Sequence, residues 1–429
     1  MKSLALVSTV LLSRLIPVAC AGYLDRSAQV VLNSPALRSD YQYDEAYLGK
    51  LLEIHNDPVE VMRLVDPSNA AKLDEPRLLQ VFGRDASWMT EGDKLRLRRE
   101  GLKFVDLTDH QDLKGDSFLR MQASESWPKL QYQEKVHEII GHLSIDSMQE
   151  NLRNLTSFYN RYYLSNHGVK SSRWVYDQIL KIISTAPPSV RLSLETFTHP
   201  FPQSSIIARF EPTYGRAVSN GNIALPRIVL GTHMDSANYR LPLLPSPGAD
   251  DDGSGTVALI EAFRALVEGG FRPERPVEFH WYAAEEAGLL GSLEVAKEYK
   301  SQNKQVQAMF QLDALAFVRQ GTTPTISFIT SGVDASLTNW TMAVASEYAS
   351  APIQGIELPL GHGSDHMPWD KIGVPVAAAT EEHPDKANPY EHTEADRIDL
   401  ANGEFSFEFI REFTKVAIGF VVELGGWVD

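Results

Sequence analysis

The stretch Arg227-Ile-Val-Leu-Gly-Thr-His-Met-Asp-Ser236 decides the fold, because an apolar run ends in side chains that bind metals. A short, continuous apolar run is typical of a strand buried on both faces of a sheet. Two further runs end in the same way, Val277-Glu-Phe-His-Trp-Tyr-Ala-Ala-Glu-Glu286 and Ala308-Met-Phe-Gln-Leu-Asp313. Since α/β folds place ligands at the carboxyl ends of their parallel strands, we expect these polar ends to meet at one edge of a sheet.

Five side chains along the chain have the chemistry of metal ligands: His233, Asp251, Glu286, Asp313 and His392. Two divalent cations that share a bridging carboxylate need about this many imidazole and carboxylate ligands. Each motif alone is more often a surface histidine, a solvated turn or the start of a helix. Carboxylates at the ends of apolar strands are costly unless they are paired or bind metal. Their joint occurrence therefore predicts a dinuclear metallohydrolase.

Neighbouring residues support these assignments. Asp235 lies two residues after His233, on the same side of an extended backbone, and could accept the other ring N–H of that histidine. The turn Pro247-Gly-Ala-Asp-Asp-Asp-Gly-Ser-Gly255 could aim its central carboxylate at a metal, because its glycines leave the backbone free to bend. The adjacent pair Glu285 and Glu286 offers one proton carrier and one ligand. Glu286 is predicted to bind metal, and Glu285 to hold water.

Apolar strands alternate with helical segments over most of the chain, which predicts an α/β fold with a central, mostly parallel mixed sheet and helices on both faces. The expected strands are 205–210, 227–231, 277–283, 308–312, 325–330 and 374–379. The expected helices are 147–163, 172–184, 254–268, 289–300, 335–350 and 403–424, and serines at 147 and 172 are expected to cap the first two.

Composition limits the classes of partner. The chain has 429 residues, is 43% hydrophobic, and has a net charge of -16 at pH 7 with a pI near 5.2. This acidity argues against nucleic acid and anionic membranes as partners. After the first residues, no apolar segment reaches the roughly 20 residues that a membrane anchor needs. A monomer that acts on peptides is the expectation.

The N-terminal part of the sequence is predicted to be a leader. Residues 1–21 have the basic, apolar and small-residue regions of a secretory signal peptide, which predicts a secreted protein. Residues 22–115, which include the amphipathic stretch Thr90–Lys103, are interpreted as a prosegment and linker, and residues 116–429 as the catalytic domain. The alternative for residues 22–115 is an ordinary helical subdomain. Cys20, inside the predicted signal, is the only cysteine, so the mature chain would contain no disulfide and no thiolate metal site.

Two sequons fit a secretory route and predict a glycoprotein. Asn154-Leu-Thr156 and Asn339-Trp-Thr341 both match the acceptor pattern for N-linked glycans.

Five motifs, in order, make the chain resemble a known family: GTHMDS, PGADDDGSG, AAEEAGLLGS, QLDALA and NPYEHTEAD. The family is that of the M28 zinc aminopeptidases, and the similarity is greatest to the secreted fungal leucine aminopeptidases. It covers roughly residues 120–429, and weakly a prosegment stretch that begins at Trp88. The resemblance also implies a cis peptide bond after Asp251.

The resemblance implies two Zn²⁺ ions per chain. Asp251 would bridge them, His233 and Asp313 would hold one ion, and Glu286 and His392 the other. Glu285 would take a proton from the attacking water and return it to the leaving amine. The substrates implied are peptides with a free N-terminus, with apolar residues such as leucine preferred.

Some assignments stay open at the level of sequence. The motif Ser364-Asp-His366 fits the family, whereas Gly361-His-Gly363 stands where some relatives have a tyrosine that stabilises the tetrahedral intermediate. His362 could replace that tyrosine, although a solvent-facing histidine is the simpler interpretation; His383 also lies near His392. The alternative functions are a carboxypeptidase or glutaminyl cyclase of the same fold, or a non-catalytic relative. Comparing leucyl substrates that have a free N-terminus with those that have an acetylated one would distinguish an aminopeptidase from these alternatives.

Overall fold

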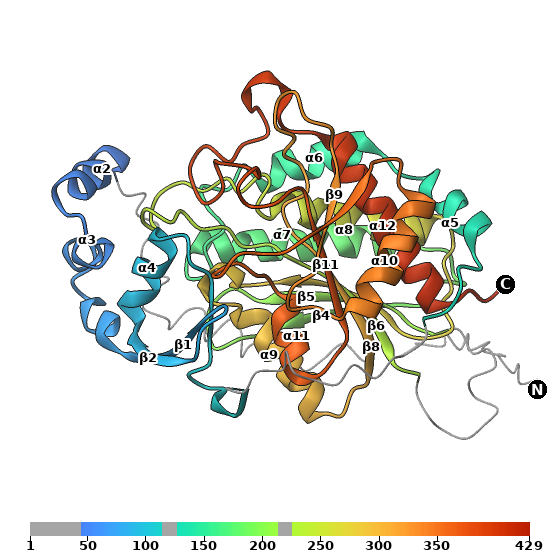
Figure 1. Cartoon of the computed structure of the whole chain (residues 1–429), viewed down its shortest axis with the longest axis horizontal. Coiled ribbons are helices and arrows are strands. Elements are labelled where there is room, and N and C mark those ends of the chain that lie inside the picture. Colours follow the sequence, from blue (N-terminus) through green and yellow to red (C-terminus); the bar gives the residue numbers. More distant parts are fainter. Residues whose placement is uncertain (1–43, 114–126, 213–224) are drawn as a thin grey trace, which may run out of the picture.

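A mixed sheet of eight strands forms the central layer of the molecule (Figure 1). The computed structural model describes residues 44–113, 127–212 and 225–429. Within them the strand order is β10-β9-β11-β8-β6-β7-β5-β4, and the four central strands β11, β8, β6 and β7 run parallel. The predicted α/β fold is confirmed. The strands are β4 (Leu192–Phe197), β5 (Ser205–Phe210), β6 (Arg227–His233), β7 (Val277–Tyr282), β8 (Val306–Leu312), β9 (Ile326–Ile329), β10 (Ile353–Ile356) and β11 (Val376–Thr380).

Helices cover both faces of this sheet. Successive residues of a strand point to opposite faces, so each central strand contributes apolar side chains to a core on either side. Ile228 and Leu230 pack into the larger core on one face, while Val229 between them packs into a second core on the other. The larger core is closed by α5 (Gln133–Ile140), α6 (Ile145–Leu155), α7 (Asn166–Ser184), α8 (Gly253–Glu268), α10 (Ala335–Tyr348) and α12 (Phe407–Gly425). The second core is closed by α9 (Leu290–Ser301) and α11 (His366–Ile372).

Strand register brings the ends of the central strands together. His233 at the end of β6 pairs with Tyr282 at the end of β7, and Gly231 pairs with Gln311 near the end of β8. The residues that follow these strands therefore emerge at one edge of the sheet, which the sequence predicted.

Several element boundaries differ from those expected. Helix α6 ends at Leu155 rather than 163 and is capped by Ser144, whose hydroxyl accepts from Ser147 N. Helix α7 begins at Asn166 rather than 172 and is capped by Ser165. The first turn of α7, Asn166-His-Gly168, is polar, so apolar periodicity alone places its start too late. Helix α12 begins at Phe407 rather than 403.

The segment 44–113, here called the N-terminal segment, is more regular than its sequence suggested. It forms an antiparallel sheet of order β2-β1-β3, although no coherent strand pattern was recognised in it. The predicted amphipathic stretch does form a helix, α4, whose start is fixed by a capping box between Thr90 and Asp93. Its elements are α2 (Glu45–Ile54), α3 (Pro58–Val65), η2 (Ala70–Asp74), β1 (Pro76–Val81), β2 (Ser87–Thr90), α4 (Glu91–Arg99), β3 (Phe104–Asp106) and η3 (Gln111–Leu113).

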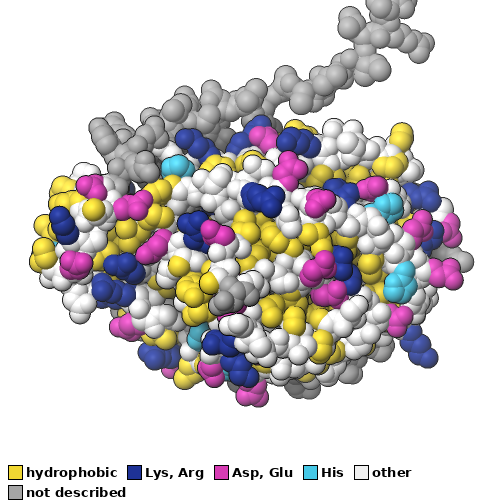
Figure 2. Space-filling model, turned by 90° about the horizontal axis from the view of Figure 1, so that it is seen from above, with side chains coloured by type: hydrophobic (Ala, Val, Ile, Leu, Met, Phe, Trp, Pro, Cys, Tyr) yellow, Lys and Arg dark blue, Asp and Glu magenta, His cyan; other side chains and the backbone are white. Residues whose placement is uncertain are grey.

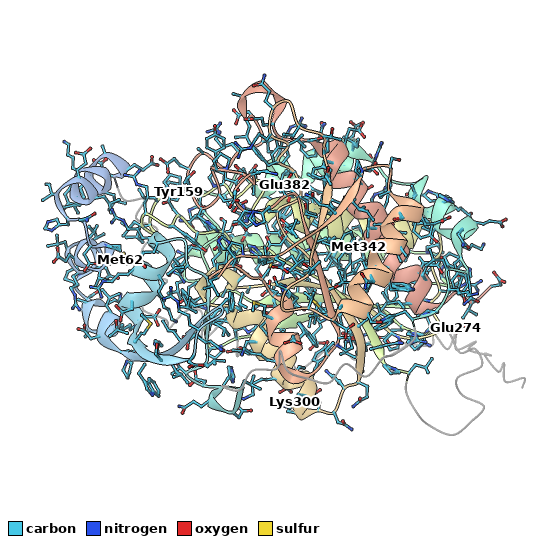
Figure 3. All side chains as sticks on the ribbon, in the orientation of Figure 1. Met62, Tyr159, Glu274, Lys300, Met342 and Glu382 are labelled. Carbon is cyan, nitrogen blue, oxygen red and sulfur yellow. The ribbon has the colours of Figure 1, made fainter. Side chains whose placement is uncertain are left out.

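The N-terminal segment lies at one end of the long axis of the molecule (Figure 1). Met62 of this segment and Glu274 of the remainder, called here the catalytic body, lie toward opposite ends in Figure 3. The predicted signal peptide 1–21 and the predicted boundary near residue 115 lie outside the described residues. The division into prosegment and catalytic domain therefore stays a prediction.

The surface carries charges of both signs. Lys and Arg side chains are interspersed with Asp and Glu across the face shown in Figure 2. Among the helices of the described residues, none is both long and apolar enough to cross a membrane.

Candidate metal centre

Three neighbouring parallel strands deliver most of the predicted site. His233 is the last residue of β6, Glu286 follows β7 in the short helix η6 (Glu285–Ala287), and Asp313 follows β8 directly. Asp251 precedes Asp252, the N-cap of α8, and His392 lies in the loop between β11 and α12. The structure thus brings all five predicted ligands to one edge of the sheet.

Asp251 occupies the centre of this cluster. Its Oδ1 lies 2.9 Å from His233 Nε2, and its Oδ2 lies 2.7 Å from His392 Nε2. Asp313 Oδ1 lies 3.4 Å from His233 Nε2, and Glu286 Oε2 lies 3.5 Å from His392 Nε2. Each oxygen of Asp251 therefore faces a different half of the cluster.

The atoms of this cluster point at one another without making ordinary hydrogen bonds. His233 Nε2, His392 Nε2 and Asp251 Oδ1 are buried and have no hydrogen-bond partner among the described residues, although ion-pair distances are short. Buried polar atoms normally have partners, so atoms that converge without proper hydrogen-bond directions are what a cation site requires. The residues present therefore fit a metal centre.

The turn that carries Asp251 is held by its neighbours. Asp396 accepts hydrogen bonds from the N–H groups of Asp250 and Asp251, and Asp252 accepts from the N–H groups of Gly255 and Ala314. The peptide bond between Asp251 and Asp252 is cis, as the resemblance implied. The Asp250 carboxylate accepts from Ala316 N, so the outer two carboxylates of the turn bond backbone N–H groups and the middle one is directed at the cluster.

Asp235 lies beneath the two adjacent glutamates. Its carboxylate accepts from Glu285 N at 3.0 Å and from Glu286 N at 3.2 Å. The ring Nδ1 of His233 lies 3.2 Å from the backbone oxygen of Asp235 and 3.5 Å from its Oδ1. Asp235 lies beside His233 as predicted, but the hydrogen bond of the ring is with the backbone oxygen of Asp235 rather than with its carboxylate. Asp235 also positions Glu285 and Glu286, which the sequence did not reveal.

Glu285 is almost fully buried, and its Oε2 has no hydrogen-bond partner among the described residues. Burial raises the pKa of its carboxyl well above the ordinary value, although the Lys103 ammonium opposes this shift. Its ligand atoms lie close to those of His233 and Asp313. A carboxyl with this environment beside a metal cluster is suited to exchanging a proton.

Lys103, from the N-terminal segment, enters this site. Its Nζ lies 3.0 Å from Glu285 Oε1, and its side chain is 17% exposed. Burial alone would lower the pKa of Lys103, but the negative charges of Glu285 and its neighbours raise it well above the ordinary value, so the ammonium stays charged. Sequence reasoning missed this residue, because nothing in Leu102-Lys-Phe104 distinguishes it from a surface lysine.

Two more residues of the cluster were not singled out from the sequence. The ring of Tyr239 stacks on that of His392, and its hydroxyl donates a hydrogen bond to Glu286. The carboxylate of Glu391 lies near Asp251 and His392. Glu391 was recognisable only as part of the NPYEHTEAD motif.

The other histidines occupy different positions. His366 is buried at the start of α11, where burial lowers its pKa to about 4. His362 lines the cavity beside the cluster, and burial is the main cause that lowers its pKa. His383 pairs with Asp385 and is only partly buried. Ser364 of the predicted Ser-Asp-His motif contacts the cluster, since its hydroxyl donates to Asp313 Oδ2 at 2.5 Å.

A cavity of about 160 Å³ opens beside Asp251 and Asp313. Apolar side chains make up part of its wall, namely Ile329, Leu358, Ala378 and Ala379. Lys103 lines it as well. The cavity can therefore take a small apolar group next to the metal cluster.

Comparison with known proteins agrees with this geometry. The family described as Peptidase family M28 matches residues 217–411. Leucine aminopeptidase 1 of Trichoderma harzianum is 39% identical over 368 residues, which cover 82% of this chain and 88% of the relative. Leucine aminopeptidase 1 of Emericella nidulans is 34% identical, with 85% and 92% covered.

A solved structure gives the same result for the fold. The aminopeptidase LapA of Legionella pneumophila is 26% identical, with a TM-score of 0.68 over 84% of this chain and 96% of that one. The predicted family and the predicted aminopeptidase activity are both confirmed, and the carboxypeptidase, glutaminyl cyclase and non-catalytic alternatives are set aside. The chain therefore belongs to peptidase family M28 and is a metallo-aminopeptidase.

Proposed function

We propose that the protein is a secreted dinuclear zinc aminopeptidase that removes apolar residues from the N-termini of peptides. The position of Asp251, with one carboxylate oxygen toward His233 and the other toward His392, carries the proposal. A carboxylate shared in this way suits two cations, and the family implies zinc. His233 and Asp313 would hold one ion, and Glu286 and His392 the other.

Bound zinc would lower the pKa of a water molecule and polarise the scissile carbonyl. The protein's own contribution is proton transfer and positioning. Glu285 would accept the proton of the attacking water and return it to the leaving amine, because its buried carboxyl lies close to His233 and Asp313. Asp235 would hold Glu285 through its backbone N–H, and His233 through its ring.

The preference for apolar residues is supported by the cavity beside the cluster. Its volume of about 160 Å³ and its Ile329, Leu358 and Ala378 surface suit a leucine-sized side chain. Burying a side chain of this kind contributes roughly 1.5–3 kcal/mol, which is enough to distinguish it from glycine or alanine.

We also propose that the N-terminal segment keeps the enzyme latent. Lys103 places an ammonium beside Glu285, in the cavity where the N-terminal amine of a substrate would have to bind. Its backbone N–H donates to Gly361 O at 2.7 Å, so a second contact holds it at the mouth of the site. While this ion pair persists, Glu285 is not available to transfer the proton from the attacking water.

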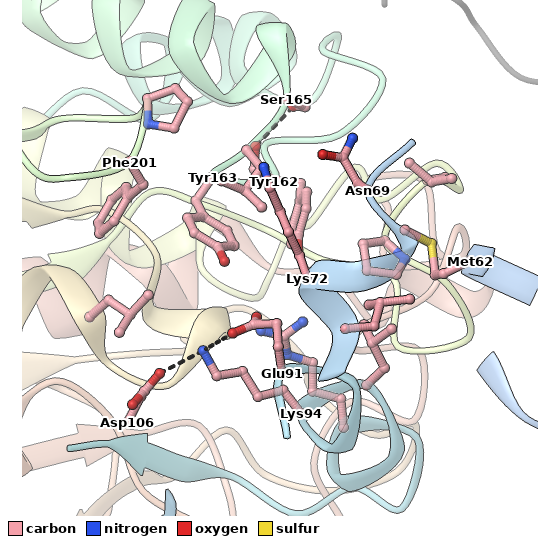
Figure 4. A pocket seen from close by; sticks show the side chains of 18 of the residues that line it. Met62, Asn69, Lys72, Glu91, Lys94, Asp106, Tyr162, Tyr163, Ser165 and Phe201 are labelled. Atoms are coloured by element: carbon pink, nitrogen blue, oxygen red, sulfur yellow. Dashed lines mark hydrogen bonds and ion pairs between the residues drawn. The ribbon is translucent and has the colours of Figure 1, made fainter. Parts of the chain in front are cut away.

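The seam between the N-terminal segment and the catalytic body is only partly filled. A cavity of about 680 Å³ lies within it (Figure 4). On one side Lys94 bridges Glu91 and Asp106, at 3.0 and 2.6 Å, and on the other Tyr162 and Tyr163 face them. An interface with a void of this size favours a segment that can be separated.

Apolar contacts across the seam favour the alternative, a permanent subdomain. Leu78 and Val105 of the N-terminal segment pack with Leu289, Leu293 and Met367 of the catalytic body. Removal of the segment would expose these side chains. The activity of the intact chain, rather than its folding, therefore distinguishes the two possibilities.

Secretion, glycosylation and a monomeric state complete the proposal. Residues 1–21 would direct secretion. Asn154 on α6 and Asn339 on α10 are both exposed, so glycans could be accommodated at either position.

One assay tests the proposed activity. The chain, clipped by a protease near residue 115 and supplied with zinc, should release product from a leucyl substrate with a free N-terminus. It should release none from the same substrate with an acetylated N-terminus, and elemental analysis should find two zinc ions per chain. Cleavage of the acetylated substrate, or one ion per chain at full activity, would contradict the proposal.

A further inference from the structure

Tyr239 lies at the cluster, yet neither the proton transfer nor the predicted set of metal ligands requires it. It follows β6 by six residues and is partly buried. Its backbone N–H donates to His392 O at 2.9 Å. This bond joins two loops that are more than 150 residues apart in the sequence.

The ring of Tyr239 fixes the plane of a predicted ligand. Its centroid lies 3.6 Å from that of the His392 imidazole, and the two planes differ by 1°. His392 has a φ of 58°, in the left-handed region that non-glycine residues seldom adopt. Such a conformation persists where the surroundings impose it, and Tyr239 contacts both the backbone and the ring of this histidine.

The hydroxyl of Tyr239 fixes a second predicted ligand. It donates to Glu286 Oε2 at 2.6 Å, and the same oxygen lies 3.5 Å from His392 Nε2. A hydrogen bond from a neutral donor to a carboxylate is stronger than one between two neutral groups, and it restricts the carboxylate to one orientation. One side chain therefore orients both Glu286 and His392.

The other half of the cluster has different supports. Asp313 accepts from Ser364 Oγ, and the ring of His233 contacts Asp235. Within the described part of the chain, the hydrogen bond and ring contact of Tyr239 are with Glu286 and His392, and neither is with His233 or Asp313. Tyr239 therefore supports only the half of the cluster that contains Glu286 and His392.

We propose that Tyr239 is a positioning residue that sets the zinc affinity of the Glu286–His392 half of the centre. The proposal rests on the proposed function, in which these two residues hold the same ion. Groups that orient metal ligands typically change metal affinity or activity by 10- to 100-fold when they are removed. The stacked ring and the hydroxyl bond make separate contributions, so two variants can separate them.

Zinc binding provides the test, with free zinc held at buffered concentrations and bound ions counted by elemental analysis. Tyr239→Phe keeps the ring and loses the hydroxyl bond, and we expect one ion to bind roughly 10-fold more weakly while the other keeps its affinity. Tyr239→Leu also loses the stack, and we expect a larger loss at the same half. With one weakened ion, kcat should recover as free zinc is raised.

Tyr299→Phe is the matched control. It removes a buried hydrogen bond of the same kind, from Tyr299 to Glu278 Oε2 at 2.8 Å, away from the cluster. This variant should bind both ions as the unmodified chain does.

Two other outcomes would be decisive. Unchanged affinity for both ions in both Tyr239 variants, or equal weakening of both ions, would overturn the role of Tyr239. Glu286→Gln distinguishes failure of the proposed function: if that variant binds two ions with full affinity, Glu286 is not a ligand and the dinuclear assignment itself is wrong.

Discussion

Lys103 Nζ and Glu285 Oε1 lie 3.0 Å apart, although 182 residues separate them in the sequence. The pair joins the N-terminal segment to the residue proposed to transfer protons. Breaking a buried ion pair by removing one partner is strongly unfavourable, because the remaining charge loses its compensation. While the segment is docked, Lys103 therefore supplies the charge that compensates Glu285, and the contact also occupies Glu285.

The first prediction concerns Lys103→Met in the intact chain. The variant should hydrolyse a leucyl substrate roughly tenfold faster than the unmodified intact chain, since about 1.4 kcal/mol of lost docking energy corresponds to a factor of ten. After proteolytic removal of the segment the two proteins should be equally active. Lys297→Met is the control, because it breaks an ion pair with Asp112 that crosses the same seam outside the site. Equal activity of the variant and the unmodified intact chains would show that Lys103 does not restrain the enzyme.

The second prediction separates the two adjacent glutamates. Glu285→Gln should lower kcat by about 10²- to 10⁴-fold while two zinc ions remain bound, because a proton carrier has been lost and no ligand has. Glu286→Gln should instead lose one ion. Activity with metal content measured on the same samples checks both variants, and the opposite pattern would exchange the two roles.

The third prediction concerns the cavity beside the cluster. Leu358→Trp should narrow this cavity. We expect kcat/KM to fall roughly tenfold for leucyl substrates and by a smaller factor for alanyl substrates, because apolar pockets discriminate between side chains of different size by small factors. Leu360→Trp in the same loop is the control, since Leu360 is 66% exposed and does not line this cavity. Equal losses for both substrates would place the side-chain pocket elsewhere.

The fourth prediction concerns the pH dependence of stability. Glu278 on β7 is buried, and burial alone would raise its pKa, but His280, Arg209 and Arg227 hold the pKa at about 2. A carboxyl whose pKa is depressed in the folded state stabilises that state above its ordinary pKa, and this contribution is lost as the pH falls through the folded value. Glu278→Gln should therefore lower the free energy of unfolding by about 3 kcal/mol at pH 7, and by progressively less from about pH 4.5 toward pH 2.

Urea unfolding across this pH range measures the effect. Glu274→Gln, at an exposed position before the same strand, should change stability by less than about 0.5 kcal/mol at each pH. A loss in Glu278→Gln that does not depend on pH would mean that packing, rather than charge, is the cause.

The central strands were predictable because they are buried on both faces. In β6 and β7 nearly every residue is buried; β6 is an apolar run with clear ends, and in β7 apolar residues alternate with the buried Glu278 and His280. Strand β4 was missed, because it lies at the sheet edge with no buried residue and its Leu192–Phe197 sequence carries no such run. Strands β1 to β3 were missed for a different reason: β1 and β3 contain buried residues, but the strands are only three to six residues long and pair only with one another.

The predicted ligands were recognisable because each follows a strand or lies in a distinctive turn. Lys103 and Tyr239 had no comparable signal. Their importance depends on which distant loops they meet, and that depends on three-dimensional packing rather than on periodicity. Asp235 was recognised as a neighbour of His233, but its bonds to the N–H groups of Glu285 and Glu286 depend on how β6 lies beside β7.

The long sequence separation between Lys103 and its carboxylate partner has a consequence for biosynthesis. The N-terminal segment is synthesised first, and at about 5–20 residues per second Glu285, 182 residues later, follows after roughly 10–40 s. During that interval Lys103 cannot pair with Glu285, and Leu78 and Val105 lack their contacts with Leu289, Leu293 and Met367. The segment can therefore dock over the site only after Glu285 and Met367 have been synthesised, so a nascent chain is inactive at first because its site is incomplete.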